Sequence, residues 1–343
     1  MSTLKTVTIL HPSSAVNNIV NDASGTVAVG NNLTVAGTST LTGNVTAAGT
    51  VAMGSSFKRN RIINGNMATD QRNAGAAQTI TAGAALAYSV DRWYAYCTGA
   101  NVTGQQVAGA TANQYRYRFT GAASVTAIGF AQRIEAINSA DLAGTTATLS
   151  VDLANSLLTT VTWTAYYANT TDTFGSLASP TVTSIATGTF TVTSTVTRYN
   201  AQISIPSAAT TGLQIVLSVG AQTSGTWTIG SVQLEVGTIA TPYERQIYSD
   251  QLAQCQRYYA FANMTARFYS TSGVQIMDTP WTTPVTMRAT PTTALFSNTG
   301  YNVNVGSITA TPTNAQGGWF ELQSTTTGDT SCRGAMYSCT AEL

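Results

Sequence analysis

Glycines recur at a nearly regular spacing in the first 55 residues, and this pattern limits what the segment can fold into. Gly30, Gly37, Gly43, Gly49 and Gly54 follow one another at intervals of seven, six, six and five residues, with single apolar residues among threonines and asparagines between them. The pattern predicts short β-segments separated by glycine turns. One copy cannot bury so narrow an apolar face, so we expect three identical chains wound around an axis as a β shaft. A flexible linker is the alternative, because Gly/Ser/Thr-rich sequence is also typical of linkers.

Composition excludes several classes of partner. Only 8% of the 343 residues are charged, while 43% are hydrophobic, so the chain can form a core and is not a disordered polyelectrolyte. Fifteen basic and fourteen acidic residues give a formal net charge of +1, which provides no basic footprint for nucleic acid or an anionic membrane. No run reaches the roughly 18 apolar residues of a membrane span, and the first residues lack a signal-peptide pattern. We therefore expect assembly in a cytosol, without membrane insertion and without nucleic acid as a partner.

Residues 56–245 read as a β-sandwich. The segment contains repeated runs of strand length that are rich in β-branched and aromatic residues and are bounded by turn residues. Eight or more strands over about 190 residues are typical of a sandwich of jelly-roll type. The clearest runs are residues 115–119, 146–153, 160–167, 188–193, 202–206, 213–219 and 227–236.

Residues 246–343 are expected to form a short helix followed by a β tip domain. The helix is predicted over residues 249–259, with Ser249 or Asp250 as its cap and with Leu252, Cys255 and Tyr259 on one face. The remainder is strand-like and is punctuated by prolines. The chain as a whole is therefore predicted to be all-β, with an N-terminal attachment region and shaft (1–55), a jelly roll (56–245) and a tip (246–343).

Four cysteines and one histidine offer little metal chemistry. No cysteine pair has zinc-like spacing, and His11 is the only histidine. Residues 333–336 could turn a hairpin between Cys332 and Cys339, which leaves both a disulfide and two half-buried thiols open. We predict no metal site and no cofactor.

Charged residues cluster in three short boxes. Asp91, Arg92 and Trp93 are adjacent, Arg133 and Glu135 are near neighbours, and Glu244 precedes Arg245. In a chain with so few charges, such groups are expected to be paired and half-buried, with a structural role; ligand contact is the alternative. The sequence Asn64-Gly65-Asn66, with Asn60 before it, predicts a turn stabilised by side-chain hydrogen bonds.

The tip carries the aromatic and amide residues expected of a glycan-contact surface. Sugar rings are bound by aromatic faces, with polar groups fixing their orientation. The group predicted for this role, as a set, is Trp281, Tyr301, Trp319, Asn302 and Asn304. Core packing is the alternative for any one of the aromatic residues.

Enzymatic activity is not expected. His11 lies in the shaft-like segment, where no pocket could hold a nucleophile beside it. Glycan cleavage needs two carboxylates roughly 5–9.5 Å apart, and no close-spaced pair on a recognisable strand is evident in the sequence. A glycan depolymerase stays an alternative.

Six stretches resemble a known family. They are HPSSAVNNIVNDASG (11–25), NNLTVAGTSTLTGN (31–44), RNRIINGNM with DQR (59–72), SVDRWY (89–94), VQLEVGTIATPYERQ (232–246) and LAQCQRYY (252–259). The first two look like the start of bacteriophage tail fibres, notably those of phages that infect cyanobacteria. The other four are similar to a phage module that joins a jelly roll, like a carbohydrate-binding module, to a short helix and a terminal β domain.

The resemblance implies a homotrimeric virion fibre, assembled in the host cytoplasm, that binds a host-surface glycan such as lipopolysaccharide. Contact with other tail or baseplate proteins would run through residues 1–30. A purely structural virion component without a host ligand, such as a head fibre or a collar or baseplate connector, is the other interpretation.

Overall fold

The chain separates into two units, Met1–Gly54 and Ser55–Leu343. The structure, a computed structural model, describes residues 7–9, 19–21, 27–28, 58–83, 85–110 and 114–343. In the first unit, β1 (Val7–Ile9), β2 (Ile19–Asn21) and β3 (Val27–Ala28) form an antiparallel sheet in that order. The run from Gly30 to Gly54 and His11 lie outside the described residues. The trimeric shaft and the three-part division of the chain therefore stay predictions.

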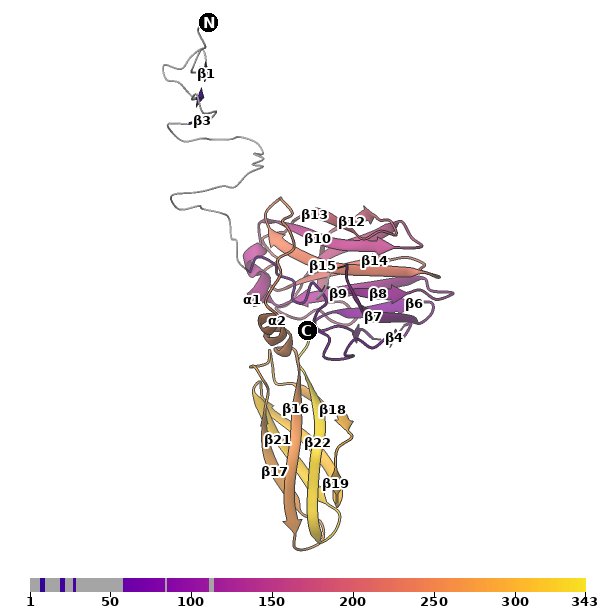
Figure 1. Cartoon of the computed structure of the whole chain (residues 1–343), viewed down its shortest axis with the longest axis vertical. Coiled ribbons are helices and arrows are strands. Elements are labelled where there is room, and N and C mark those ends of the chain that lie inside the picture. The colour runs from indigo at the N-terminus through magenta and orange to yellow at the C-terminus, as the bar shows by residue number, and fades with distance from the viewer. Residues whose placement is uncertain (1–6, 10–18, 22–26, 29–57, 84, 111–113) are drawn as a thin grey trace. The chain divides into compact units, whose positions relative to one another are not determined.

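The first part of the second unit is an antiparallel β-sandwich of two six-stranded sheets, here named S1 and S2 (Figure 1). Many neighbouring strands are distant in sequence, since β10 pairs with β13 and β15, and β14 pairs with β9 and β11. This all-β sandwich confirms the predicted fold class. S1 contains, in spatial order, β13 (Thr197–Ser204), β10 (Thr146–Asn155), β15 (Thr226–Val236), β8 (Tyr115–Thr120), β7 (Val102–Ala108) and β4 (Gln78–Ile80). S2 contains β12 (Val182–Thr191), β11 (Thr160–Ala168), β14 (Leu213–Val219), β9 (Ala127–Ile134), β6 (Tyr94–Thr98) and β5 (Ala87–Tyr88).

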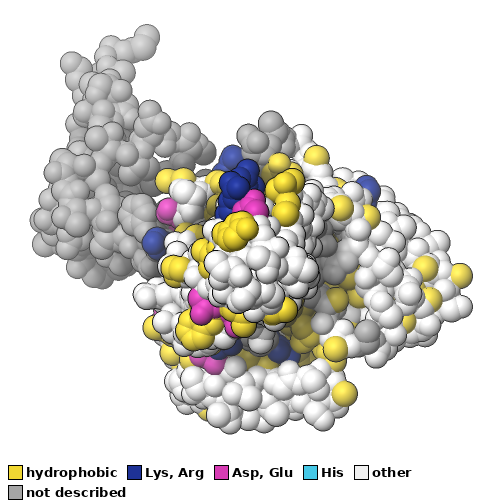
Figure 2. Space-filling view, turned by 90° about the horizontal axis from the view of Figure 1, so that it is seen from below, with side chains coloured by type: hydrophobic (Ala, Val, Ile, Leu, Met, Phe, Trp, Pro, Cys, Tyr) yellow, Lys and Arg dark blue, Asp and Glu magenta, His cyan; other side chains and the backbone are white. Residues whose placement is uncertain are grey.

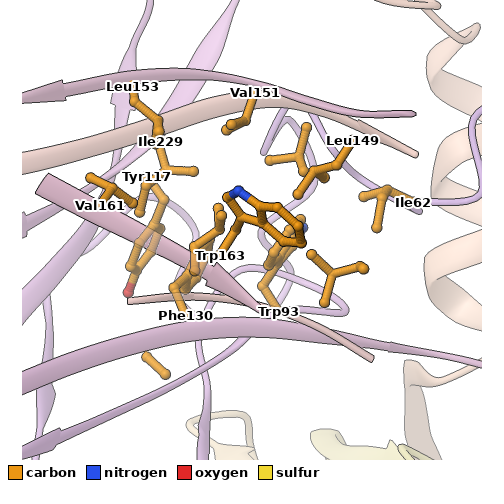
Figure 3. Close-up of a cluster of buried hydrophobic side chains, with 14 of the residues drawn as sticks. Ile62, Trp93, Tyr117, Phe130, Leu149, Val151, Leu153, Val161, Trp163 and Ile229 are labelled. Carbon is orange, nitrogen blue, oxygen red and sulfur yellow. The ribbon is translucent and has the colours of Figure 1, made fainter. Parts of the chain in front are cut away.

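The core of the sandwich follows from the alternation of side chains along each strand. In β11, Val161, Trp163 and Ala165 are buried, while the threonines between them face outward. Figure 3 shows side chains of both sheets meeting in this core. The ring of Phe130 stacks on Trp93 at 4.7 Å and on Tyr117 at 5.0 Å. Aromatic contacts of this kind pack the two sheets against each other.

Three short helical segments belong to the second unit. They are α1 (Ala136–Ser139), the 3-10 turn η1 (Ala140–Leu142) and α2 (Tyr248–Gln256). The predicted cap of α2 is wrong, because the helix begins one residue earlier: the carbonyl of Ile247 accepts from the N–H groups of Asp250 and Gln251, and no side chain caps it. The predicted helix face is also wrong in part. Cys255 is buried beside Gln251, but Tyr259 is already in a strand.

The tip is a second, smaller sandwich with its own core. Its sheets, T1 and T2, enclose Met264, Trp281, Phe320 and Tyr337. T1 contains β16 (Tyr259–Ser270), β22 (Gly328–Thr340) and β18 (Thr292–Asn298), with β19 (Asn302–Val303) pairing with β22. T2 contains β17 (Ile276–Thr282), β21 (Gly317–Ser324) and β20 (Val305–Asn314).

The predicted hairpin between Cys332 and Cys339 is wrong. Both cysteines lie on the single continuous strand β22, seven residues apart, and both are buried, free thiols. Gly334 adopts φ +85° at a break in the β16–β22 register, which is a bulge and not a turn. Seven residues of extended chain span roughly 23 Å, so the two sulfurs cannot form a disulfide with each other.

Candidate functional site

The structure does not bring the predicted tip residues together. Trp281 is only 6% exposed and belongs to the tip core. Trp319 is 42% exposed and lies on T2, opposite Pro280 in the strand register. Tyr301, 63% exposed, lies beside T1, where its carbonyl accepts from the N–H of Arg333.

The two predicted amide residues, Asn302 and Asn304, both contact strand β22 of T1. Asn302 pairs with Cys332 and donates to the side chain of Asn298. Asn304, at φ +51°, bonds to the backbone and side chains of residues 325–326 and to Thr330, so it fixes a turn. The group is therefore divided between the core, a turn and two different sheets.

The SVDRWY box lies where the sandwich meets the tip, and its charged side chains are buried. Arg92 forms an ion pair with Glu342, and Arg72 forms a second ion pair with the same carboxylate at 2.8 Å. The Arg92 guanidinium lies over the ring of Tyr258 at 3.5 Å. Its carboxylate partner is thus not the adjacent Asp91, because that side chain turns to accept two hydrogen bonds from Gln71.

Glu135 joins the tip to the sandwich in the same region. Its carboxylate accepts from the Arg257 guanidinium at 3.1 and 3.2 Å and from the Tyr258 hydroxyl at 2.8 Å. On the other side of the junction, Gln251 of α2 donates to Asn64 and Thr69. The stretches 59–72, 89–94 and 252–259 are therefore gathered into one buried polar network.

The remaining predicted residues have different surroundings. Trp93 is in the sandwich core, where its indole N–H donates to the carbonyl of Asn64. Glu244 accepts from the backbone N–H of Asn60 at 2.9 Å. Arg245 is exposed, and none of the ion pairs between described residues includes it.

The asparagine-rich turn forms as the sequence predicts. Asn64 is at φ +56° and its side chain both donates to and accepts from the backbone of Thr69. Asn66 accepts from the N–H of Ala68. Gly65 packs so closely that a Cβ there would lie 2.1 Å from the carbonyl oxygen of Val232, so the glycine is needed for contact with β15.

A surface that the sequence predictions missed lies on the outer face of S2. The residues of β6 that point away from the core are Tyr94, Tyr96 and Thr98, since Ala95 and Cys97 belong to the core. Tyr88 meets Tyr94 edge-on at 6.0 Å, and Tyr94 lies 6.4 Å from Tyr96. Together with Tyr166 and Leu177 they form a separate apolar cluster on this face.

Tyr96 lies flat on the sheet because its neighbour has no side chain. Tyr96 pairs with Gly129 of β9, and a Cβ at that glycine would lie 2.1 Å from the Tyr96 Cζ. The ring therefore rests on the β9 backbone. Burial, and to a smaller extent the neighbouring Tyr166, raises the pKa of the Tyr96 phenol, so at neutral pH its hydroxyl is protonated and can both donate and accept.

Beside this ring is a groove of about 530 Å³. We name it the tyrosine groove. Tyr96 and Thr98 line one side and Leu177 the other, so an aromatic ring, hydroxyls and an aliphatic side chain meet in one concavity. Its lining residues are Gly83, Ala85, Tyr96, Cys97, Thr98, Ser176, Leu177 and Ala178.

Arg133 holds the far wall of the tyrosine groove in place. That wall is part of the loop at residues 169–181, between β11 and β12. The guanidinium donates to the carbonyl of Gly175 at 2.8 Å and to the main-chain oxygen of Leu343 at 2.6 Å, and it lies 5.4 Å from the ring centre of Phe174. Its Nε donates to the side chain of Gln214, and among the described residues no Asp or Glu side chain forms an ion pair with it.

One carboxylate pair is brought together by T2, which the sequence did not reveal. Asp278 of β17 stands directly opposite Glu321 of β21, next to Trp319. The two residues are 43 positions apart in the sequence, so no local spacing indicated the pair. Asp278 is exposed and Glu321 is half-buried, so neither has the apolar surroundings that prepare a general acid.

Among the residues that the structure describes, no three His, Cys, Asp or Glu side chains are grouped to hold a metal ion. In the same part of the chain, no helix combines the length and the apolar character needed to cross a bilayer.

Comparison with known proteins finds likeness in structure only. No family model matches the chain, and no curated protein matches it. The enzymatically active domain of bacteriophage CBA120 tailspike protein 4 matches with a TM-score of 0.33 and 17% identity, over 52% of this chain and 22% of that one. A CBM4 protein matches with a TM-score of 0.33 and 18% identity, over 51% and 98%. The family 11 carbohydrate-binding module of Clostridium thermocellum Lic26A-Cel5E gives 0.30 and 13%, over 49% and 99%. Likeness at this level does not assign a ligand or an activity.

Proposed function

We propose that this protein is a non-catalytic glycan-binding protein and that the tyrosine groove of the sandwich holds a sugar. The observation that carries the proposal is the Tyr96 ring, which lies flat over Gly129 at the wall of a groove of about 530 Å³. An aromatic face stacks on the apolar face of a sugar ring, and nearby hydroxyls fix its orientation. Thr98 and Ser176, which both line the groove, carry such hydroxyls.

The wider proposal is a tail fibre of a bacteriophage that attaches the particle to a host-surface glycan such as lipopolysaccharide. The resemblance of six sequence stretches supports it, and so does the all-β architecture. Single glycan contacts are weak. Three chains in one fibre would raise the effective concentration of sites and give avidity without any new contact.

Binding of oligosaccharides from host lipopolysaccharide to Tyr96→Ala and Gly129→Ala tests the groove. Removing the ring should cost about 2 kcal/mol, or roughly 30-fold in affinity. Gly129→Ala keeps the phenol but lifts the ring from the sheet, and should weaken binding as well. Tyr248→Ala, at an exposed tyrosine of α2, is the control and should bind normally. Unchanged affinity in both groove variants, with unchanged thermal melting, would contradict the proposal.

The same variants distinguish an adhesin, meaning a fibre that attaches the particle to the host, from a purely structural virion component. An adhesin with Tyr96→Ala should assemble into normal particles that adsorb poorly to the host. Normal adsorption by such particles would favour the structural role.

The carboxylate pair on T2 makes a glycan depolymerase the enzymatic alternative to test. We expect no oligosaccharide to be released when the protein is incubated with host lipopolysaccharide. Release that is lost in Asp278→Asn and Glu321→Gln would overturn the non-catalytic assignment.

A further inference from the structure

The outer face of T1 gathers two arginines, an aspartate and two tyrosines. Met264 and Ala266 point into the tip core, so the residues that alternate with them along β16, including Arg267 and Tyr269, point outward. In the strand register Arg267 is opposite Ser331, and Tyr269 is opposite Asp329.

The other two residues, Arg333 and Tyr301, lie next to this group. Arg333 is opposite Thr265 and donates its N–H to the carbonyl of Tyr301 at 3.0 Å. We name Arg267, Tyr269, Tyr301, Asp329 and Arg333 the arginine face. Figure 2 shows basic side chains gathered into one patch on the tip, with acidic atoms beside them and hydrophobic side chains at the margin.

The arginine face has an excess of positive charge in a defined geometry. Two of the three guanidinium nitrogens of Arg267, Nε and Nη2, each donate to the Asp329 carboxylate at 2.9 Å, a fork-to-fork arrangement that fixes the guanidinium. Arg333 has no carboxylate within ion-pair distance among the described residues. It still acts on the cluster, since Arg267 and, more weakly, Arg333 lower the pKa of Asp329.

The aromatic members are unusually open to solvent. Tyr269 is 67% exposed and Tyr301 is 63% exposed, so neither ring contributes much to the tip core. Exposed apolar side chains with polar groups at their rim are typical of contact surfaces. The same face carries the two guanidinium groups, and a guanidinium is the side-chain group best shaped for a carboxylate or a phosphate group.

We infer that the arginine face binds a saccharide carrying an acidic group, with Arg333 taking the carboxylate or phosphate and the tyrosines contacting the sugar ring. The inference rests on the proposal that the protein binds a glycan, and it adds the class of sugar. A nucleic acid fits poorly, because two guanidinium groups partly neutralised by Asp329 match one acidic group and not a continuous polyanion.

The test compares acidic saccharides with neutral counterparts on the full chain. One arm uses a glucuronic-acid-containing oligosaccharide and its carboxyl-reduced form, and the other uses phosphorylated dextran and dextran. We expect at least tenfold tighter binding of the acidic member of one pair or both, weakening as salt is raised. The arm that shows the difference identifies the acidic group.

Arg333→Gln should remove most of that preference and leave binding of the neutral member unchanged. The matched control is Arg118→Gln, at an exposed arginine of β8, and it should keep the preference. Equal binding of acidic and neutral saccharides by the natural protein, or a preference that survives Arg333→Gln, overturns the inference. If Tyr96→Ala nevertheless abolishes saccharide binding, the proposed function stands and only the inference about the arginine face fails. Failure of the natural protein to bind any saccharide removes both.

Discussion

Arg92 carries a full charge into a place almost closed to water. Its side chain is 1% exposed, and its two terminal nitrogens donate to the Glu342 carboxylate and the carbonyl of Arg133, while the ring of Tyr258 lies against the guanidinium. Glu342 lies 250 residues further along the chain. The sequence indicates that Arg92 needs a partner, because an isolated buried charge is too costly. The residues near Arg92 in the sequence do not show which carboxylate that partner is.

Glu342→Gln should destabilise the second unit by about 3–5 kcal/mol, because it leaves the Arg92 charge buried and unpaired. Urea unfolding followed by tryptophan fluorescence would measure the change. Asp141→Asn, which breaks a solvent-exposed pair with Arg61, is the control and should cost about 0–1 kcal/mol. Equal effects of the two substitutions would show that the buried pair is not needed.

Asp91 should make stability depend on pH. Burial raises the pKa of its carboxyl to about 7, opposed by the hydrogen bonds from Gln71 and by Arg72. The unfolded chain has a pKa of about 4. Between these values the folded protein binds the extra proton, so this residue's contribution to the free energy of unfolding falls as pH rises from about 4 to 7.

Asp91→Asn should remove that contribution, since the amide is neutral at every pH. Comparing the free energy of unfolding of the natural protein and the variant at several pH values isolates the effect of Asp91 from other carboxyl groups. The difference between the two should change by up to about 4 kcal/mol between pH 4 and 7. A constant difference would mean that folding does not raise the pKa of this carboxyl.

At the scale of elements, the alternation of apolar and polar residues predicted strands well, and glycine positions predicted turns less well. The runs at residues 146–153, 160–167 and 213–219 lie within β10, β11 and β14. By contrast, Gly334 suggested a turn although it marks a bulge within β22. A glycine with positive φ serves both structures, and only the partner strand β16 distinguishes them.

The loop at residues 169–181 should depend on a single side chain from the sheet beneath it. Arg133→Ala removes the hydrogen bond to Gly175 and the contact with Phe174. We expect faster amide hydrogen exchange in this loop and about tenfold weaker glycan binding, because one wall of the tyrosine groove loses its support. Arg118→Ala should change neither. Unaltered exchange at residues 174–178 would contradict the role given to Arg133.

At the scale of the whole molecule, the sandwich and the tip have separate cores but share one buried polar network. Glu135 of the sandwich depends on Arg257 and Tyr258, and Arg92 depends on Glu342. A fragment ending at residue 245 would leave both charges without partners. We therefore expect residues 55–245 alone not to fold, as judged by near-ultraviolet circular dichroism. A cooperatively melting fragment would show that the sandwich does not need the tip.

Removing the first unit should have a different effect. Ser55–Leu343 contains both cores and the network between them, so it should fold with the melting temperature of the intact second unit. If the glycine-punctuated segment forms a trimeric shaft, the full chain should sediment as a trimer and this fragment as a monomer. A monomeric full chain would rule out the shaft and the avidity that depends on it.

The sequence by itself determined what is local: the strands, the Asn64 turn and the need of Arg92, Arg133 and Glu135 for buried partners. These follow from side-chain alternation, from the φ that each residue tolerates and from the cost of burying a charge. Tertiary structure decided which distant residues meet. The tyrosine groove requires Tyr96 to cross Gly129, and the arginine face requires β16, β22 and the segment before β19 to lie side by side. Strand pairing fixes such neighbours across gaps of tens to hundreds of residues, and no short stretch of sequence encodes that choice.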